Sequence, residues 1–431
     1  MLDFRTYPMK VIPDPISGIV DIGPVLPMVE TPEFQLLADK RQLGMTYLVF
    51  RAAMHTRLSH CLGAYQATTI LAERWFQWGF ITRTERDALV GYALYHDIGH
   101  PAFSHVTEDF CRLNDDQMTL ELIRGPLRKA IAACGIDQAL MESLASHQNP
   151  LYLAVHDKNV GTEKLDYLER DGFYTILSRP AGVEYLRRYV YFIDGQVAVD
   201  EKVVEHAMDA QTFYMKMYKG VYLRKSLVIA QRMFHKAVHH LILTGTLNPD
   251  RLHNMTDSEL LGMMAFSDDP TACRMYQLLR ERKLFREAIV IRPAAFVHET
   301  RVAGKPIAVM GASPDEIDRL MHTASLQKKN HRELERLENR IADLACIPAG
   351  SVLVVPVFNP ERFRAKDVTV YGSDGKLHSL RERRPAHFTD MEETARSYFA
   401  LRVCVQPEHR SLLSEPLMAS NIVDLIMTIP D

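Results

Sequence analysis

The chain has 431 residues, a length that suggests two domains or one large core with appendages. Its content of 47% hydrophobic and 24% charged residues is typical of a soluble globular protein. The net charge of −3, from 51 basic and 54 acidic residues, argues against broad electrostatic binding to nucleic acid or to an anionic membrane.

The sequence carries no targeting or membrane signal. Its first residues, MLDFRTYPMKVIPDP, contain no continuous apolar stretch of the kind found in signal peptides. No run of about 18 apolar residues is present to predict a transmembrane helix. The six cysteines are scattered and form no CxxC pair, which favours reduced core thiols over a disulfide framework or a thiolate zinc site. We therefore expect a cytoplasmic protein with no membrane partner.

The first half of the chain has mainly helical patterning. Residues 1–20 are rich in proline and β-branched residues and predict a short strand and turns. From about Thr31 to residue 240 the pattern is helical, and Thr31-Pro32-Glu33 resembles a helix N-terminus. Thr82 and Glu85 have capping-box spacing and open a helix that we expect to end at Gly99 and Pro101.

The composition changes after about residue 285. Apolar residues at helical spacing in 200–244 stop at Thr244-Gly245, and strand-like segments follow at 289–298, 351–358, 367–372 and 398–405. Ser373-Asp374-Gly375 is a candidate hairpin turn. An amphipathic helix is marked by Leu334, Leu337, Ile341 and Leu344, and the charged run at 332–340 is interpreted as its solvated face. We predict a mainly α fold with a helical core and short N-terminal strand/turn segment at 1–285, and an α+β C-terminal subdomain at 286–431.

Candidate chemistry is concentrated in the segments 54–63, 95–105 and 162–171. A divalent ion that serves phosphate hydrolysis needs neutral imidazoles and carboxylates that converge from separate elements. His96-Asp97 offers nitrogen and oxygen ligands where a helix meets a Gly/Pro break, and a ligating dipeptide benefits from a helix end because adjacent helical residues do not share a face. His60 and an acid from 163–171 would complete the set. Arg57, one turn before His60, would point the same way and could clamp a phosphate oxygen.

Each of these residues also has a plainer interpretation. A His-Asp dipeptide alone is weak evidence, and a second one, His156-Asp157, is interpreted as a surface loop. His100 either orients a ligand or merely ends the helix. Arg57 could pair with a surface carboxylate. His235 and His239 have metal-ligand spacing but no nearby acid, so packing or solvated histidines are the favoured interpretation.

The segments together resemble the HD superfamily, specifically its dGTPase-like branch of dNTP triphosphohydrolases, which includes bacterial enzymes and the mammalian SAM-and-HD-domain dNTPase. The similar stretches occur in order over about residues 10–245. They are KVIPDPISG (10–18), TPEFQLLADKRQLG (31–44), HTRLSHCLG (55–63), HDIGHPAFSH (96–105), EKLDYLERD (163–171) and VYLRK (221–225).

The resemblance implies a role for particular residues. The implied metal ligands are His60, His96, Asp97 and Glu163. The implied catalytic residues are Arg57, on a substrate phosphate, His105, near the reacting phosphate, and His100, as a ligand-orienting partner. The implied substrate contacts are Gln42, Arg57, Lys164, Tyr167 and Asp171.

The chain departs from the branch at three places. The fourth ligand is usually Asp but is Glu163 here, and if Glu163 does not ligate, a water or Asp166 would take its place. Asp115-Asp116 stands where the branch commonly has a His-Glu pair, which puts the rate or the activity itself in question. Of the nucleotide-regulator site, Lys10 and Val11 persist, whereas the expected Asp and Arg are Glu30 and Ala38, which argues against guanine-nucleotide activation of the mammalian kind.

The resemblance implies hydrolysis of a nucleotide, a dNTP giving deoxynucleoside and triphosphate. It implies a divalent transition metal ion, with Mn, Fe, Ni and Zn as candidates and Mg as a further ion that accompanies the substrate phosphates. The implied partners are the nucleotide substrate and further copies of the chain, as a dimer or tetramer, and nucleic acid is not expected as the main partner. Two alternatives remain open: another HD phosphohydrolase acting on a different nucleotide or small phosphoester, and a catalytically weakened nucleotide-binding sensor.

Overall fold

The computed structural model describes residues 10–357 and 365–428. The chain forms two compact units, each assembled from segments that are distant in sequence. Unit 1 contains Met1–Met217, Pro249–Leu260 and Lys366–Phe388, and unit 2 contains Tyr218–Asn248, Leu261–Ala365 and Thr389–Asp431. This division differs from the boundary expected at residue 285, because the chain passes back and forth between the units. The predicted mainly α fold with a smaller α+β region is confirmed.

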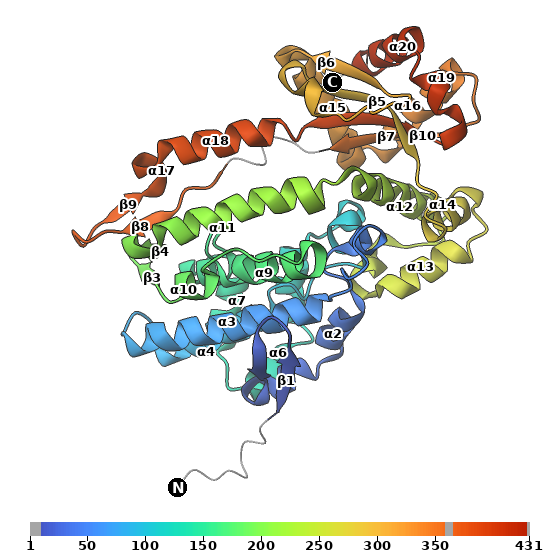
Figure 1. Ribbon diagram of the computed structural model, residues 1–431. Helices are drawn as coiled ribbons and strands as arrows, with labels where there is room; N and C mark the ends of the chain where they lie inside the picture. The colour runs from blue at the N-terminus through green and yellow to red at the C-terminus, as the bar shows by residue number, and fades with distance from the viewer. Residues whose placement is uncertain (1–9, 358–364, 429–431) are drawn as a thin grey trace. The chain divides into compact units, whose positions relative to one another are not determined.

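Unit 1 is a helical body in which two long helices, α3 and α4, lie side by side and α9 packs against α3 (Figure 1). Its helices are α1 (Leu26–Val29), α2 (Pro32–Gln35), α3 (Arg57–Gln77), α4 (Arg83–Tyr95), α5 (Asp115–Arg124), α6 (Arg128–Ala133), α7 (Gln138–Ala145), α8 (Leu153–His156), α9 (Thr162–Ile176), α10 (Val183–Arg187), α11 (Val204–Met217) and α17 (Leu380–Arg383). The buried faces of α3, α4 and α9 supply the residues of the candidate site.

Several helix and turn signals are confirmed. Thr31 caps α2, and its hydroxyl accepts a hydrogen bond from the Phe34 backbone N–H. Thr82 and Glu85 form the reciprocal capping box of α4, which satisfies N–H groups that the first helical turn leaves unpaired. The turn at 373–375 joins two antiparallel strands, and Gly375 adopts the positive φ of 74° that such a turn requires. The first nine residues lie outside the described part of the chain.

Unit 1 also contains two small sheets. Strands β1 (Val11–Asp14) and β2 (Gly18–Asp21) form a hairpin, in agreement with the strand and turn expected there. The second sheet has the order β3-β4-β8-β9, with β4 and β8 parallel and the other neighbours antiparallel. Its strands are β3 (Val190–Ile193), β4 (Gln196–Asp200), β8 (Thr369–Tyr371) and β9 (Leu377–Ser379).

The strands β3 and β4 correct the expectation of a helical pattern from Thr31 to residue 240. The two strands flank Asp194-Gly195, both of which have positive φ, of 51° and 75°. An Asp-Gly pair between β-branched and aromatic residues is a strong local hairpin signal. This signal was obscured by the helical periodicity of the sequence on either side of it. The partner strand of β4 is β8, about 170 residues later in the sequence, so local patterning could not indicate that pairing.

Unit 2 is an α+β structure built on a four-stranded sheet with the order β6-β5-β10-β7. Strands β5 and β6 are parallel, and β10 is antiparallel to both β5 and β7. The strands are β5 (Arg286–Pro293), β6 (Ala308–Ala312), β7 (Val352–Val357) and β10 (Ala400–Val405). The helices are α12 (Lys225–Leu243), α14 (Pro270–Arg280), α15 (Pro314–Lys329), α16 (His331–Leu344), α19 (Arg410–Leu413) and α20 (Pro416–Met427), while α13 (Asp257–Ala265) and α18 (Pro385–Arg396) cross the unit boundaries.

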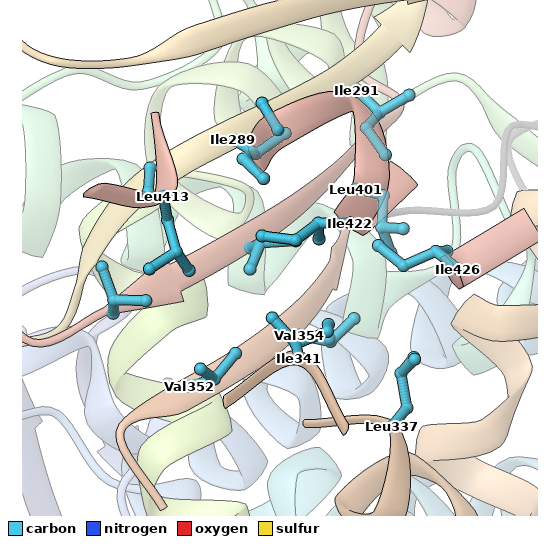
Figure 2. Close-up of a cluster of buried hydrophobic side chains, with 14 of the residues drawn as sticks. Ile289, Ile291, Leu337, Ile341, Val352, Val354, Leu401, Leu413, Ile422 and Ile426 are labelled. Carbon is cyan, nitrogen blue, oxygen red and sulfur yellow. The ribbon is translucent and has the colours of Figure 1, made fainter. Parts of the chain in front are cut away.

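The core of unit 2 lies between this sheet and α16, α19 and α20. Figure 2 shows branched side chains from the three elements meeting those of the strands. The members labelled there are Ile289 and Ile291 of β5, Val352 and Val354 of β7, Leu401 of β10, Leu337 and Ile341 of α16, Leu413 of α19, and Ile422 and Ile426 of α20. Alternating inward residues of the strands thus meet one apolar face of each helix.

The predicted amphipathic helix is α16, with two corrections. Leu344 is 41% exposed, so the apolar face ends one turn earlier than expected. The run at 332–340 is not uniformly solvated, because Glu338 is buried. Its two carboxylate oxygens contact Arg232 Nη2 at 2.6 Å and Lys236 Nζ at 2.8 Å, both from α12. The sequence around Glu338 contains no pattern to indicate that two cationic side chains of another helix will pair with it.

The remaining sequence expectations are met in part. His235 and His239 are buried in unit 2, with their rings 4.8 and 5.2 Å from the ring of His331, which agrees with packing. All six cysteines are free, although only Cys61 and Cys404 are fully buried. No helix among residues 10–357 and 365–428 is long and apolar enough to cross a bilayer.

The buried charges on α16 give a first prediction. Glu338→Ala leaves Arg232 and Lys236 in the interior without their carboxylate, and removing one partner of a buried pair costs roughly 3–5 kcal/mol. Glu333→Ala is the matched control on the same helix, because Glu333 pairs with the exposed Arg336 and the loss should be about 0–1 kcal/mol. Chemical denaturation of the full chain measures both, and equal small losses would contradict the prediction.

Candidate metal centre

The site begins where α3 starts and α4 ends. Thr56 caps α3 by accepting a hydrogen bond from the Ser59 backbone N–H, and this places Arg57 and His60 on the first turn of the helix. α4 ends at Tyr95, so His96 is its C-cap residue and Asp97 begins the following turns. The expected end at Gly99 and Pro101 is therefore late by about one turn, but the dipeptide lies at a helix end as predicted.

Gly99 allows this loop to sit against the start of α5. A Cβ at this position would lie 2.3 Å from the Asp115 carbonyl oxygen and 2.5 Å from the Thr119 backbone nitrogen, which no side chain can tolerate. The loop is further held by the Thr119 hydroxyl, which accepts a hydrogen bond from Gly99 N–H at 3.1 Å. The backbone after the His96-Asp97 pair is thus fixed by packing.

Four side chains converge at this point. Ligand atoms of His60, His96, Asp97 and Glu163 all lie within 4.8 Å of one another, and the first three residues are buried. The residues come from the start of α3, the end of α4 and the first turn of α9. Within the described residues, this is the one group of three or more His, Cys, Asp and Glu residues that comes together in this way. The four ligands implied by the family resemblance are therefore adjacent in space.

The two imidazoles face each other in a way that calls for a cation. His60 Nδ1 lies 2.8 Å from the Asp166 carboxylate and His96 Nδ1 lies 2.8 Å from the Ala93 carbonyl oxygen, so each Nδ1 carries the hydrogen. The Nε2 atoms then present lone pairs, and these two atoms are 3.2 Å apart. Two facing lone pairs repel unless a proton or a metal ion lies between them. The donor set of two imidazoles and two carboxylates therefore fits a divalent transition metal ion.

Asp166 contacts the ring nitrogen of His60 that faces away from His96. Its Oδ2 contacts both His60 Nδ1 and, at 2.9 Å, Arg170 Nε, and Arg170 Nη1 reaches Asp14 at 2.8 Å. Although burial opposes the charged form, Arg170 and His60 hold the pKa of the Asp166 carboxyl well below its usual range. Asp166 is therefore engaged on the far side of His60, which leaves Glu163 as the acid of α9 that faces the other ligands.

Gly63 makes this support possible. A Cβ on Gly63 would lie 2.0 Å from Asp166 Oδ1 and 2.4 Å from Arg170 Nη2. α3 and α9 can therefore approach closely enough for the carboxylate to reach His60 only because this residue has no side chain.

Asp97 is surrounded by positive charge and hydrogen-bond donors. Arg57 Nη1 pairs with its Oδ2, and Arg57 Nε donates to Ser104 Oγ at 2.7 Å. Burial disfavours an ionised carboxylate, but Arg57, His100 and the other nearby histidines hold the pKa of Asp97 well below its usual range. Arg57 is 2% exposed, so the alternative of an exposed surface pair does not apply to it.

The His100 ring lies between two carboxylates, and its Nδ1 is hydrogen-bonded to the Asp97 backbone carbonyl oxygen at 3.3 Å. Its Nδ1 lies 3.4 Å from Asp97 Oδ1 and its Nε2 lies 3.0 Å from Asp115 Oδ2. Burial, reinforced by the charge of Arg57, lowers the pKa of His100 to about 3, so the ring is neutral near pH 7. Asp115 does open a helix as expected, with Asn114 as its N-cap.

The loop after Asp97 is held in a strained conformation. Phe103 and Ser104 both have positive φ, of 58° and 52°, a region that non-glycine residues rarely adopt. The buried Asp257 accepts a hydrogen bond from Phe103 N–H at 2.7 Å, and buried Lys40 donates to the His100 and His253 carbonyl oxygens at 2.6 Å each. This backbone conformation places the Ser104 hydroxyl where it accepts the hydrogen bond from Arg57 Nε.

The second His-Asp pair corrects the interpretation as a surface loop. His156 ends α8, its side chain is only 12% exposed, and its Nδ1 lies 2.7 Å from Glu163 Oε2. Despite its burial, Glu163 has a pKa held below the usual range by His156. A contact between residues seven positions apart on different helices has no local sequence signature.

The remaining candidate residues are distributed around the four ligands. Lys164 is buried, which lowers its pKa well below the usual value, and its Nζ lies over the rings of Tyr214 and Tyr167. The Tyr167 ring is 6.4 Å from the His60 ring. His105 is different: its side chain is 72% exposed and faces Glu108 at 3.0 Å, with its ring 5.1 Å from that of His100.

Two of the expected substrate-contacting residues, Gln42 and Asp171, are connected through His55. His55 Nε2 lies 2.9 Å from Asp171 Oδ1, and the His55 carbonyl accepts a hydrogen bond from Gln42 N–H at 3.0 Å. The His55 ring stacks on Tyr174 at 4.7 Å. The regulator-site positions Lys10, Val11, Glu30 and Ala38 are exposed.

Sequence reasoning missed the residues that support the ligands. These are His55, Ser104, His156, Asp166 and Arg170. For Asp166 and Arg170 a signal existed, since their spacing of four on α9 predicts an ion pair on one helix face. For the other three, the sequence separation from their partners left no pattern to read.

A second prediction concerns metal content. His96→Ala removes one imidazole of the facing pair, and Asp97→Asn keeps the side-chain shape but removes its charge. Protein purified with Mn²⁺, Fe²⁺, Ni²⁺ or Zn²⁺ should retain about one ion per chain in the wild type and far less in both variants. His105→Ala is the control, because an exposed ring outside the cluster should leave the content unchanged. Elemental analysis measures the metal content, and circular dichroism verifies that each variant is folded. An unchanged metal content in the His96 and Asp97 variants would contradict the assignment of these residues as ligands.

Comparisons with known proteins agree with this geometry. A family model described as "HD domain" matches residues 57–130, and one described as "HD associated region" matches residues 183–306. The uncharacterized protein YwfO of Bacillus subtilis is 29% identical over 246 residues, which cover 53% of this chain and 56% of YwfO. The deoxynucleoside triphosphate triphosphohydrolase SAMHD1 of Danio rerio is 42% identical over 106 residues, or 23% of this chain and 17% of that protein. The chain thus spans little more than half the length of YwfO.

Solved structures extend the similarity of fold to nearly the whole chain. The crystal structure of a phosphohydrolase from Bacteroides thetaiotaomicron matches with a TM-score of 0.69 at 21% identity and covers 92% of this chain and 99% of that one. A hypothetical protein from Aquifex aeolicus matches with a TM-score of 0.67 at 20% identity, covering 94% and 99%. At these identities the likeness concerns the fold. The chain therefore carries an HD domain with an HD-associated region, and it is similar to HD phosphohydrolases, among them the dNTP triphosphohydrolases named SAMHD1.

Proposed function

We propose that this protein is a metal-dependent phosphohydrolase that cleaves a dNTP into deoxynucleoside and triphosphate. The observation that carries the proposal is the convergence of buried His60, His96 and Asp97 with the partly buried Glu163, in which the Nε2 atoms of the two imidazoles face each other at 3.2 Å. Neutral imidazoles and carboxylates from separate helices are the donor set that phosphate hydrolysis with a divalent ion requires. The SAMHD1 relatives, named as dNTP triphosphohydrolases, support the choice of substrate.

The chain supplies positive charge beside these ligands. A bound divalent ion provides a Lewis acid for the phosphoryl group and lowers the pKa of water. Arg57 and Lys164 are proposed to bind the phosphate oxygens, since both are buried next to the ligand cluster and cations in a dry site stabilise developing negative charge strongly. The low pKa of Lys164 would rise when a polyanion binds beside it.

The nucleoside end of the substrate is proposed to lie near Gln42, Tyr167 and Asp171. Gln42 Oε1 is buried and has no hydrogen-bond partner among the described residues, so it is available to a hydroxyl donor. His55 orients Asp171 by its hydrogen bond, and stacking on Tyr174 fixes the His55 ring.

Proton transfer to the leaving group is assigned to His105. The Glu108 carboxylate contacts its Nδ1, so Nε2 is the nitrogen that would hold the transferred proton. His100 is proposed to orient Asp97, and its other nitrogen lies 3.0 Å from Asp115 Oδ2. We further propose a cytoplasmic homo-oligomer, a dimer or tetramer, with Mn, Fe, Ni or Zn at the site and Mg on the substrate phosphates.

A metal-by-substrate screen tests the proposed reaction. Purified protein is incubated with each dNTP, the corresponding NTPs and deoxynucleoside monophosphates in the presence of Mn²⁺, Fe²⁺, Ni²⁺, Zn²⁺ or Mg²⁺, and the products are separated by anion-exchange chromatography. We expect deoxynucleoside and tripolyphosphate in equal amounts. Orthophosphate as the product would instead identify another phosphohydrolase. Saturable nucleotide binding without any product would identify a sensor.

Arg57 gives a third prediction. Because Arg57 is the buried partner of Asp97, Arg57→Ala would disturb stability as well as activity, so Arg57→Lys is the informative variant. Lysine keeps the positive charge but lacks the planar fork that binds two oxygens at once. We expect near-wild-type metal content and melting temperature, with kcat/KM lowered roughly 10- to 1,000-fold. Wild-type kinetics in Arg57→Lys would remove the residue from phosphate binding.

A further inference from the structure

His156 makes a direct contact with the outer side of the candidate metal centre. Its Nδ1 lies 2.7 Å from Glu163 Oε2, and because an ionised carboxylate has no hydrogen to donate, the Nδ1 hydrogen must point to the oxygen. Glu163 has two oxygens, so this bond occupies one and leaves the other for an ion. The His156 ring is also 5.6 Å from the ring of His96, another member of the cluster.

The turn that carries His156 is built rigidly. Asp157 Oδ1 accepts hydrogen bonds from the Asn159 and Val160 backbone N–H groups at 2.9 and 2.8 Å, which closes a local Asx turn. The Asn159 side chain donates to the Asp367 carbonyl at 2.7 Å and thereby ties the turn to the region before β8. His156 is therefore held in place before any ion arrives.

Gly161 brings this turn against the start of α9. A Cβ on Gly161 would lie 2.3 Å from the Val155 carbonyl oxygen and 2.6 Å from the Asp157 backbone nitrogen. The absence of a side chain lets α8 and the first turn of α9 approach closely, so that His156 meets Glu163, the second residue of α9. Asp157, Asn159 and Gly161 thus all act to place one imidazole beside one carboxylate.

We propose that His156 is a positioning residue of the metal centre, which fixes the longer side chain of Glu163 so that its free oxygen points at His60, His96 and Asp97. This inference rests on the proposed metal-dependent function. A glutamate has one more rotatable bond than an aspartate, and an unrestrained carboxylate loses conformational freedom when it ligates. The hydrogen bond from His156 removes that freedom in advance. Residues that hydrogen-bond to metal ligands in this way typically contribute 10- to 100-fold to metal affinity.

The test measures Mn²⁺ affinity of the full-length protein by calorimetry or electron paramagnetic resonance. His156→Phe keeps an aromatic ring but removes the donor, and it should weaken Mn²⁺ binding about 10- to 100-fold. His156→Asn retains an N–H near the Nδ1 position and should restore most of the affinity. His147→Asn is the control: this exposed imidazole lies 5.5 Å from the His156 ring, and asparagine tolerates its positive φ, so affinity should not change.

A double-mutant cycle with Glu163→Ala separates positioning from packing. If His156 acts through Glu163, His156→Phe should cause no further loss of Mn²⁺ affinity once the carboxylate is gone. Wild-type affinity in His156→Phe would overturn the proposal, and so would an equal loss in both backgrounds or a similar loss in His147→Asn. Failure of the wild type itself to bind Mn²⁺, Fe²⁺, Ni²⁺ or Zn²⁺ would overturn the proposed function and the role of His156 with it.

Discussion

The buried carboxylate of Asp166 is the interaction on which the site depends. It accepts hydrogen bonds from His60 and Arg170, and Arg170 in turn contacts Asp14 of the N-terminal hairpin. An ionised group this deeply buried is stable only because it is fully paired. Its reach to His60 requires the close approach of α3 and α9 at Gly63. Together these contacts fix the tautomer of His60, and the free nitrogen of that ring then faces His96. The chemistry proposed for the centre follows from this orientation.

The candidate ligands could be predicted from the sequence, but most of their supports could not. His60, His96 and Asp97 stand in segments whose composition already indicates metal chemistry, and helix signals such as the Thr82–Glu85 capping box are local. The sequence indicates a surface loop at His156, because its partner Glu163 lies on another helix and leaves no local pattern. Glu338 was assigned to a solvated face for the same reason, since the cations that pair with it come from α12. The hairpin of β3 and β4 had a local signal at Asp194-Gly195 that the surrounding helical pattern obscured.

The departures from the family pattern have a common physical form. Glu163 is longer than the usual aspartate, and His156 occupies its outer oxygen. Asp115 replaces a histidine, and His100 connects it to Asp97. Each changed side chain thus lies beside an imidazole: His156 donates a hydrogen bond to Glu163, and the His100 ring lies between Asp115 and Asp97. The contacts of Asp97 continue through Arg57 to Ser104. Of the exposed regulator positions, Glu30 keeps a carboxylate, whereas Ala38 lacks the charge of the arginine that the resemblance leads us to expect.

One metal ion is proposed to lie between His60 and His96. Anomalous diffraction at the Mn absorption edge, from crystals grown with Mn²⁺, tests it most directly. The account predicts a single strong peak in each chain, about 2.0–2.3 Å from both Nε2 atoms, with Asp97 and Glu163 oxygens completing the protein ligands. A Mn²⁺-containing crystal with no peak at this position, or with its only peak bound to other residues, would contradict the account.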